Sequence, residues 1–236
     1  MKRRSVMGAA GAMLASLALA TSVLAAGFGN GSFETGNYVR FSADYDFARV
    51  YAPSTAIDNW TVTQGSVDWI GAYWQAQQGS RSLDLDGDEG VPGAISQTFD
   101  TNVGSSYFVS FYMSGNPDQG PTLKTMTVSA TGGSTTAYTY DTSAAGTTLA
   151  NMQWAVKGYT FTATSVATTL TFTSTTPGGY GPALDNVVIT ETRPAGAQCK
   201  GGGWMAMTDR FGTPFKNQGD CVSYFATGEK NLAAGD

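Results

Sequence analysis

The chain has 236 residues, with 13 lysine and arginine residues against 18 aspartate and glutamate residues, and no histidine. The missing histidine excludes Ser-His-Asp and Cys-His nucleophile systems and histidine-ligated zinc, so an enzyme of this composition would depend on its carboxylates. The acidic balance also argues against nucleic-acid binding, because contacts to phosphates need cations.

The first predicted element is a secretory signal peptide over residues 1–26. The chain opens with the basic letters MKRR, continues with a run rich in Gly, Ala and Leu, and ends this run in small residues. This order is typical of a signal peptide cleaved after Ala25 or Ala26. The alternative is a membrane anchor, but its glycine, serine and threonine residues make the run weakly apolar for a spanning helix. We expect a secreted, extracellular protein with no membrane segment after cleavage, in which 10 Lys and Arg remain against 18 Asp and Glu.

Residues 27–192 are predicted to form one strand after another. Apolar and polar residues alternate, and Thr, Val, Tyr and Phe are frequent, which indicates strands with one buried face. Gly, Pro, Asn and Asp interrupt the strands at short intervals, and no convincing helical period occurs outside the signal peptide. The Thr-rich run at 160–177 is interpreted as a strand pair. The pattern predicts an all-β sandwich or jelly roll, whose clearest strands are 106–113, 124–131, 168–175 and 183–190.

The stretch GSVDWIGAYWQAQQGSR (65–81) has the composition of a sugar-binding surface. Flat aromatic faces pack against the C–H groups of sugar rings, while nearby polar side chains bond the hydroxyls. The alternative is that its two tryptophans are core or loop-anchoring residues. The polar loop GNPDQGP (115–121) is a second candidate, for which a simple turn is the alternative. The predicted ligand-binding residues are Trp69, Tyr73, Trp74, Arg81, Asn116 and Asp118.

The stretch LDLDGDEG (83–90) begins as many calcium loops do, with three alternating aspartates. An EF-hand loop starting at Asp84 would need glycine at its sixth position and a bidentate acid at its twelfth. Those positions hold Glu89 and Ile95, so the motif fails. A polar turn, a local calcium contribution from Asp86, Asp88 or Glu89, and a catalytic carboxylate pair stay open as interpretations.

The sequence changes character near residue 193. Residues 193–198 read as a linker, and residues 199–236 form a tail rich in glycine and aromatic residues. The chain's two cysteines, Cys199 and Cys221, lie in this tail. An even number of cysteines in an exported chain predicts one disulfide. The closed loop of about 23 residues would contribute roughly 3.4 kcal/mol in the chain-entropy description.

Seven segments occur in a characteristic order and spacing: NGSFE (30–34), NWTVTQGSVDWIG (59–71), GSRSLDLDG (79–87), GAISQTF (93–99), GNPDQGP (115–121), NMQW (151–154) and GPALDNVVI (181–189). In this order they resemble the choice-of-anchor C family of secreted bacterial proteins, which is related to the plant cell-wall proteins of "domain of unknown function 642". Both resemble galactose-binding-like jelly rolls, the fold of many carbohydrate-binding modules. The resemblance covers about residues 27–192 and implies a galactose-binding-like β-sandwich.

The resemblance also has a departure at the C-terminus. The family is named for varied C-terminal anchors, yet no hydrophobic sorting tail or LPxTG-like signal is present here. The cysteine-containing tail resembles a short tail found on other secreted bacterial proteins. This departure argues against the covalent or membrane anchoring that the family name implies, and association with the cell surface stays open.

Galactose-binding-like jelly rolls often hold a structural calcium ion between the end of the first strand and the last strand. The resemblance assigns Glu34 and Asp185 to this ion, with loop carbonyls completing the six to eight oxygen ligands that calcium needs. The alternative is that Glu34 caps a turn and Asp185 bonds backbone amides. The resemblance also makes RSLDL (81–85) a strand, DGDEGVPG (86–93) a hairpin turn and AISQTF (94–99) the next strand. Leu83 and Leu85 would then point inward, and Ser82, Asp84 and Asp86 outward.

The favoured function is a secreted, non-catalytic carbohydrate-binding module for cell-wall or extracellular polysaccharide. The first alternative is a structural or adhesive surface protein that acts through protein contacts, with the cysteine-containing tail as its contact element. A glycoside hydrolase is the second alternative, with Asp84/Asp86 or Asp44/Asp46 as the carboxylate pair. A wet outward strand face would not raise the pKa of either pair, which argues against hydrolysis.

Overall fold

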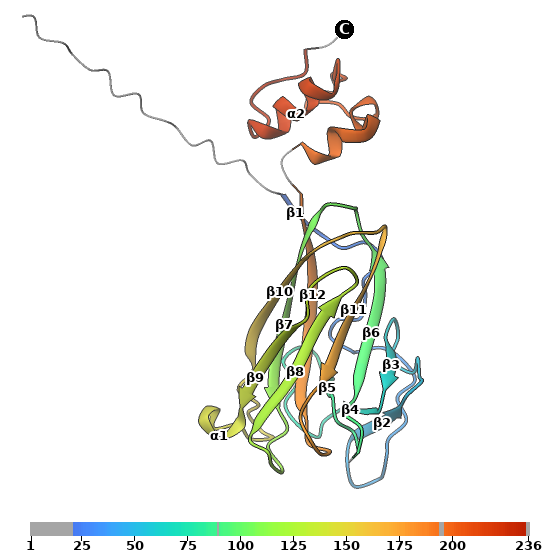
Figure 1. Ribbon diagram of the computed structural model, residues 1–236, viewed down its shortest axis with the longest axis vertical. Helices are drawn as coiled ribbons and strands as arrows, with labels where there is room; N and C mark the ends of the chain where they lie inside the picture. Colours follow the sequence, from blue (N-terminus) through green and yellow to red (C-terminus); the bar gives the residue numbers. More distant parts are fainter. Residues whose placement is uncertain (1–20, 89, 194–195, 235–236) are drawn as a thin grey trace, which may run out of the picture. The chain divides into compact units, whose positions relative to one another are not determined.

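The computed structural model describes residues 21–88, 90–193 and 196–234. The chain divides into two compact units, Ser22–Thr192 and a second that includes Arg193–Asp236 (Figure 1). The first is a sandwich of two β-sheets, and the second is a small helical unit closed by a disulfide. The predicted all-β sandwich with a short disulfide-closed appendage is confirmed. Most of the predicted signal peptide, residues 1–20, lies outside the described residues.

The first sheet has the strand order β10-β7-β12-β5-β4-β2, and β1 also pairs with β12. The short strand β1 belongs to the predicted signal peptide, so cleavage at the predicted position would remove it. The bounds are β1 (Thr21–Leu24), β2 (Phe47–Tyr51), β4 (Ser66–Ile70), β5 (Ser82–Asp84), β7 (Ser106–Gly115), β10 (Ala155–Thr162) and β12 (Pro182–Arg193).

The second sheet has the order β3-β6-β11-β8-β9, and all its ladders are antiparallel. Its strands alternate as the sequence predicts: Leu170 and Phe172 of β11 are buried, and Thr171 between them faces outward. The bounds are β3 (Thr61–Gln64), β6 (Ala94–Asp100), β8 (Leu123–Ala130), β9 (Thr136–Asp141) and β11 (Ala167–Ser174).

The main core lies between the two sheets. Phe111 of β7 meets Phe172 of β11 edge to face, with ring centroids 5.2 Å apart, so the contact joins one sheet to the other. Trp60 and Phe33 are also buried there, and their rings lie 5.3 Å apart. Burial of each such ring contributes about 1.5–3 kcal/mol, which makes this layer the main source of the sandwich's stability.

Two connections cross from one sheet to the other where the sequence predicted pairing within a sheet. β5 lies in the first sheet and β6 in the second, so residues 85–93 form a crossover and not a hairpin turn. Likewise β10 pairs with β7, whereas β11 pairs with β6 and β8. Both predicted pairings are therefore wrong, although the strands themselves are present. Neighbouring strands of a sandwich can lie in facing sheets, and a short polar connection does not distinguish the two arrangements.

A second, smaller core covers the outer face of the first sheet. It consists of Phe47, Ile70, Trp74, Met152 and Ala183. Because loops cover this face, the outward side chains of the central strand β5 are buried as well. Asp84 and Asp86 are 1% and 0% exposed, which corrects the prediction that they face water. Leu83 and Leu85 point into the main core, as expected.

The second unit is built around the predicted disulfide, which joins Cys199 to Cys221 and is confirmed. Cys199 lies in η1 (Ala197–Ala206), two short 3₁₀ turns, and Cys221 lies in the helix α2 (Gln218–Ala226). Asn217 caps α2 by accepting the Asp220 N–H. The sequence analysis missed α2 and the single-turn α1 (Thr142–Ala145), because such short segments show no helical period. No helix in residues 21–88, 90–193 and 196–234 has the length and apolar character that crossing a bilayer requires.

Candidate functional site

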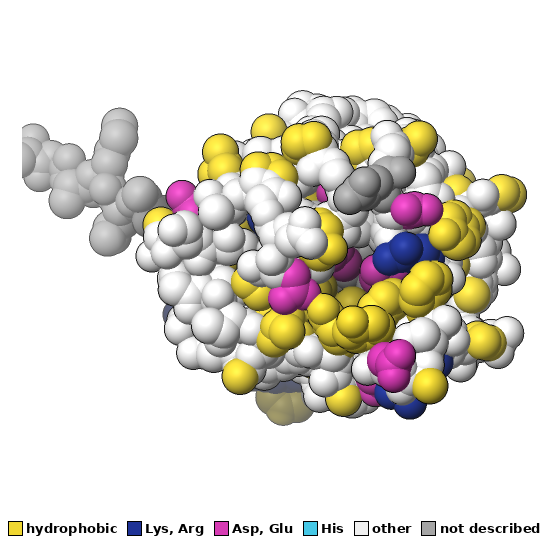
Figure 2. Space-filling model, turned by 90° about the horizontal axis from the view of Figure 1, so that it is seen from below, with side chains coloured by type: hydrophobic (Ala, Val, Ile, Leu, Met, Phe, Trp, Pro, Cys, Tyr) yellow, Lys and Arg dark blue, Asp and Glu magenta, His cyan; other side chains and the backbone are white. Residues whose placement is uncertain are grey.

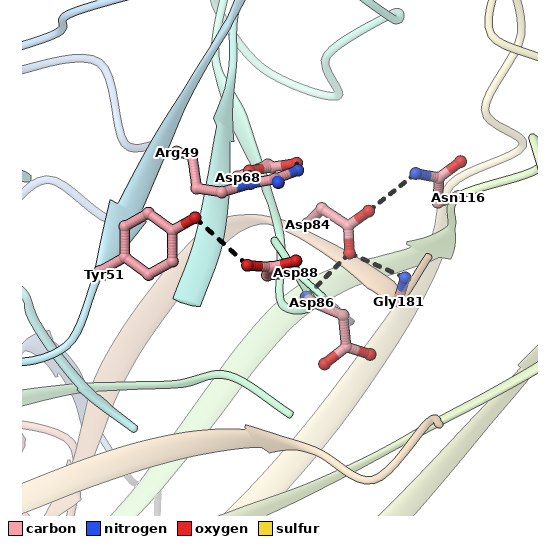
Figure 3. Close-up of polar contacts among 8 residues, drawn as sticks. All are labelled: Arg49, Tyr51, Asp68, Asp84, Asp86, Asp88, Asn116 and Gly181. Atoms are coloured by element: carbon pink, nitrogen blue, oxygen red, sulfur yellow. Dashed lines mark hydrogen bonds and ion pairs between the residues drawn. The ribbon is translucent and has the colours of Figure 1, made fainter. Parts of the chain in front are cut away.

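A row of charged side chains crosses the outer face of the first sheet. Arg49 of β2 pairs in register with Asp68 of β4, which pairs in turn with Asp84 of β5. Adjacent strands place these residues on the same face, because each occupies an outward position. The Arg49 guanidinium donates two parallel hydrogen bonds to Asp68, from Nε to Oδ1 at 2.8 Å and from Nη2 to Oδ2 at 2.9 Å (Figure 3).

Burial decides the protonation behaviour of this row. Desolvation raises the pKa of Asp68 to about 6, although the ion pair with Arg49 opposes the shift. The hydrogen bonds that Arg49 donates to Asp68 raise the pKa of Arg49, so the arginine stays charged. Burial raises the pKa of Asp84 well above its ordinary value. The prediction that Asp84 lies on a wet strand face, where its pKa would not be raised, is therefore wrong.

The buried acids fasten the loops around them. Asp84 accepts hydrogen bonds from Asn116 Nδ2 at 2.8 Å, from the Gly181 N–H at 2.9 Å and from the Asp86 N–H at 3.0 Å (Figure 3). Asp86 accepts from Ser174 Oγ at 2.6 Å, and burial raises the pKa of Asp86 to about 6. These bonds fix the loop ends at positions 116 and 181 against the sheet.

Lys124 of β8 is a fully buried cation beside these acids. Its Nζ donates to the carbonyl of Gln119 at 3.0 Å and to the carbonyl of Tyr180 at 2.6 Å. Burial lowers the pKa of Lys124, while Asp84 and Asp86 act against that shift. The lysine therefore ties together two loops that approach the charged row from different parts of the chain.

A pocket of about 530 Å³ lies over the Arg49–Asp68 pair. Figure 2 shows hydrophobic, acidic and basic side chains gathered around a hollow on this end of the molecule. The aromatic residues that line the pocket are Phe41, Tyr45, Phe47, Tyr73 and Tyr180. The polar and charged lining residues are Arg49, Asp68, Asp88, Asn116 and Asp118.

The aromatic wall of the pocket leaves ring surface open to solvent. Phe41 and Phe47 are stacked with centroids 5.4 Å apart, and Tyr45 stacks on Phe47 at 6.1 Å. Phe41 is 53% exposed and Tyr45 is 50% exposed, so both can cover a ligand. The Arg49 guanidinium lies 4.7 Å from the Phe41 ring centroid. This cation–π contact holds the Phe41 ring against the Arg49–Asp68 pair.

Three of the predicted binding residues meet in this pocket. Tyr73 and Asp118 line it side by side, with the Tyr73 hydroxyl donating to Asp118 Oδ2 at 2.5 Å. Asn116 lines it too, and its amide is already bound to Asp84. Burial, followed by the bond to Asp118, raises the pKa of Tyr73, so this hydroxyl remains a donor.

Trp69 and Trp74 lie elsewhere, at 1% and 4% exposure. The Trp69 indole donates to the Phe33 carbonyl at 2.8 Å inside the main core, and the Trp74 indole donates to Ser82 Oγ at 2.7 Å in the smaller core. Neither ring presents a face to a ligand, which corrects the predicted stacking role. Every residue of β4 is buried, so Trp69 serves packing, as Trp74 does in the loop that follows this strand.

Arg81 does not reach the pocket either. Its guanidinium lies 3.4 Å from the centroid of the Tyr38 ring and 5.4 Å from that of Trp69. It lines a separate hollow of about 330 Å³ together with Asp46 and Ser80. Of the six predicted binding residues, only Tyr73, Asn116 and Asp118 line the same pocket.

Glu34 and Asp185 hold the same loop. Glu34 accepts from the N–H groups of Ser80 and Arg81, each at 2.9 Å, and from Ser80 Oγ. Asp185 accepts from the N–H groups of Gln77 and Gln78 at 2.8 and 2.9 Å. This matches the alternative in which the two carboxylates bond backbone amides.

The two carboxylates were also tested as calcium ligands. The partners of Glu34 and Asp185 are N–H and O–H donors, whereas calcium needs six to eight oxygen ligands. Within residues 21–88, 90–193 and 196–234, no three His, Cys, Asp or Glu side chains come together as a metal site. The set as it stands does not fit the ion. Glu89, a further candidate ligand, lies outside the described residues.

The sequence analysis did not identify the wall residues Phe41 and Tyr45, their neighbour Arg49, or Tyr180. The signal for the first three was available in FSADYDFARVY (41–51), where aromatic residues recur beside an arginine that alternates with apolar positions. Tyr180 follows the glycines of PGGYGP and has no comparable pattern. The pocket combines segments that are far apart in the sequence, which periodicity cannot bring together.

Comparisons with known proteins place the sandwich in a family. The family described as "Protein of unknown function (DUF642)" matches residues 27–190. Halomucin of Haloquadratum walsbyi is 39% identical over 166 residues, which are 69% of this chain and 2% of halomucin. The chain thus corresponds to a very small part of that relative.

Solved structures of low sequence identity are also similar to this chain. TmCBM61, solved in complex with β-1,4-galactotriose, is 18% identical and superimposes with a TM-score of 0.43, covering 69% of this chain and 95% of its own. The CBM22-1 xylan-binding domain of Paenibacillus barcinonensis Xyn10C is 19% identical with a TM-score of 0.41, covering 64% and 97% of the two chains.

Proposed function

Since this chain belongs to the DUF642 family, whose function its description leaves open, we propose from its own pocket that it is a secreted carbohydrate-binding module. The ligand would be a cell-wall or extracellular polysaccharide, held without being cleaved. The narrower resemblance to the choice-of-anchor C proteins is part of this proposal and rests on the seven shared segments.

The observation that carries the proposal is the composition of the 530 Å³ pocket. One side offers exposed ring faces from Phe41 and Tyr45, which suit the C–H faces of a sugar. The other side offers oxygen acceptors from Asp88 and Asp118, which suit hydroxyl groups. An apolar wall with a few fixed polar groups is the usual composition of a small-ligand site.

We propose no catalytic role for the pocket, because its acids Asp68 and Asp118 are bonded to neighbouring side chains. Asp68 is held by the bidentate bond to Arg49, and Asp118 accepts the Tyr73 hydroxyl. Asp84, whose pKa burial raises most strongly, does not line the pocket. A hydrolase needs one raised and one ordinary carboxylate, both facing the bond to be cleaved.

The test is a titration of residues 27–236 with soluble β-1,4-glucan, β-1,4-galactan and xylan, followed by calorimetry. We expect saturable binding of at least one polymer, and Tyr45→Ala should weaken it about tenfold, because the variant loses the stacking surface. Phe211→Ala is the matched control, since Phe211 is 69% exposed but belongs to the second unit. New reducing ends in the same mixtures would contradict the non-catalytic assignment.

Absence of binding to every polymer would overturn the proposed function. The structural or adhesive alternative would then be favoured, with protein contacts in place of sugar contacts. Binding that Tyr45→Ala leaves intact would show that the sugar site lies elsewhere on the sandwich.

A further inference from the structure

The charges that line the pocket are strongly unbalanced. Arg49 is the one cation among the described residues that line it, against the three carboxylates of Asp68, Asp88 and Asp118. The Nε and Nη2 groups of Arg49 already donate to Asp68, so this carboxylate offsets the positive charge of the arginine. An arginine fork is the usual recognition element for a carboxylate ligand, and here one edge of the fork is occupied.

Asp88 and Asp118 are the other acids that line the pocket. Asp118 is exposed and accepts the Tyr73 hydroxyl, while Asp88 is exposed and accepts the Tyr51 hydroxyl at 3.3 Å. Each of these hydroxyls is a neutral donor, so the bond that it makes does not cancel the charge of the carboxylate. Figure 3 shows Asp88 on the same side of the sheet as the Arg49–Asp68 pair.

The layer behind the pocket supplies no cation that a ligand can reach. Asp84 and Asp86 are buried there, and Lys124 is the cation beside them. Lys124 donates hydrogen bonds to the carbonyls of Gln119 and Tyr180, and its side chain is fully buried. It can offset part of the field but cannot touch a ligand.

We propose that this pocket accepts uncharged and amino-bearing sugar residues and rejects sugars that carry a carboxylate. The proposal deepens the carbohydrate-binding function and rests on it. A uronate would meet three carboxylates at close range against one arginine that Asp68 already offsets, whereas the aromatic wall and the acids both favour an ammonium group. The Arg49 guanidinium over Phe41 shows that this wall already holds a cation.

The test compares one backbone in three charge states. The probes are neutral β-1,4-glucan oligosaccharide, the same chain oxidised at C6 to the uronate, and the chitosan oligosaccharide with its C2 amine. The β-1,4-galactan oligosaccharide and its C6-oxidised form provide a second backbone. The uronate forms should bind about tenfold or more weakly than their neutral counterparts, and added salt should narrow the gap by screening. The chitosan form should bind at least as tightly as the neutral chain.

The discriminating variant is Asp88→Asn with Asp118→Asn, which keeps the side-chain shapes and removes two negative charges. The ratio of uronate to neutral dissociation constants should fall about tenfold or more. The charge-matched control is Asp58→Asn with Asp100→Asn, two exposed acids outside the pocket lining, for which the ratio should stay at the wild-type value. Asp118→Asn alone serves if the double variant does not fold, and a smaller fall in the ratio is then expected.

The outcomes separate the two proposals. Binding of neutral sugar with equal or tighter binding of the uronate overturns the charge selection and leaves the carbohydrate function standing. An unchanged ratio in the Asp88/Asp118 variant also overturns it. No binding of any probe overturns the carbohydrate function, and the charge selection falls with it.

Discussion

Among single residues, Lys124 shows how a polar side chain in the interior can organise a surface site. It lies on β8 of one sheet, yet it bonds the carbonyls of Gln119 and Tyr180 at the rim of a pocket on the other sheet. A buried charge costs free energy unless its partners satisfy it, and here carbonyls and nearby acids do so. The position of the pocket loops therefore depends on a residue that no ligand touches.

We predict that Lys124→Met destabilises the sandwich by about 3 kcal/mol. The substitution leaves two carbonyls without their donor and leaves Asp84 and Asp86 without a neighbouring cation. Urea unfolding of the variant and wild type measures the difference. Lys157→Met is the control, because Lys157 is partly exposed and its loss should change stability by less than about 0.5 kcal/mol. Equal stability of Lys124→Met and wild type would contradict the role given to the lysine.

At the level of elements, the loop after β4 is secured by carboxylates from two distant segments. Glu34 and Asp185 lie near opposite ends of the sandwich's sequence and bond successive N–H groups between residues 77 and 81. Each carboxylate accepts two backbone N–H groups, so four donors of this loop are satisfied by side chains. The loop is thus closed by side chains and not by a strand ladder.

We predict that Glu34→Gln lowers the melting temperature of the sandwich by a few degrees, with a loss of about 1 kcal/mol. We also expect calcium and EDTA to leave the wild-type melting temperature unchanged, because N–H and O–H donors occupy both carboxylates. Calorimetric melts in the two buffers test both expectations. A calcium-dependent rise that Glu34→Gln or Asp185→Asn abolishes would restore the calcium site that the family resemblance implies.

The helical unit gives a second prediction at this scale. Its core is small, with Phe215 and Tyr224 packed around the disulfide between Cys199 and Cys221. A unit of this size rarely folds without such a link. Cys199→Ser with Cys221→Ser should unfold residues 196–234, visible as rapid amide exchange, and leave the melting of the sandwich within about 1 °C of wild type. Retained protection in those residues would show that the disulfide is dispensable.

The sequence predicts elements better than it predicts their partners. The strands at 106–113 and 168–175 follow from alternation, because each has one face in the core. The sheet to which β6 and β11 belong could not be predicted, since pairing is decided by contacts between distant segments. For the same reason Trp69 and Trp74 look like binding residues in the sequence, although Trp69 lies in the main core and Trp74 in the smaller one. Tyr73, Asn116 and Asp118 lie in polar loops and line one pocket, although Asn116 is buried and bonded to Asp84. Their role in binding stays a prediction.

For the molecule as a whole, the buried acids set the pH dependence of folding. Burial raises the pKa of Asp68 and Asp86 to about 6 and that of Asp185 to about 7, above the ordinary value of 3.8. The folded state therefore holds protons that the unfolded chain releases. The resulting stability is fully present below pH 3.8 and is lost as pH rises through 6 to 7.

We predict that the free energy of unfolding of the sandwich falls by about 2 kcal/mol or more between pH 4.5 and pH 8. Denaturant unfolding at a series of pH values measures it. Asp86→Asn should flatten the curve, because an amide does not titrate, whereas Asp58→Asn should leave its slope as in wild type, since Asp58 is exposed. A stability that rises over this interval would contradict the assigned shifts.

Strand β12 separates the pocket from the points where the chain enters and leaves the sandwich. It begins at Pro182, two residues after the pocket residue Tyr180, and runs for 12 residues to Arg193, about 36 Å at the rise of an extended strand. The entering chain meets it near the far end, where the Ala25 N–H donates to the Ile189 carbonyl. The β1 and β12 ends lie together at one end of the sandwich in Figure 1, away from β2 and β4. An attachment at either end of the sandwich therefore leaves the pocket accessible. Such a sandwich can be linked in tandem or fixed to a solid support with the pocket facing solvent.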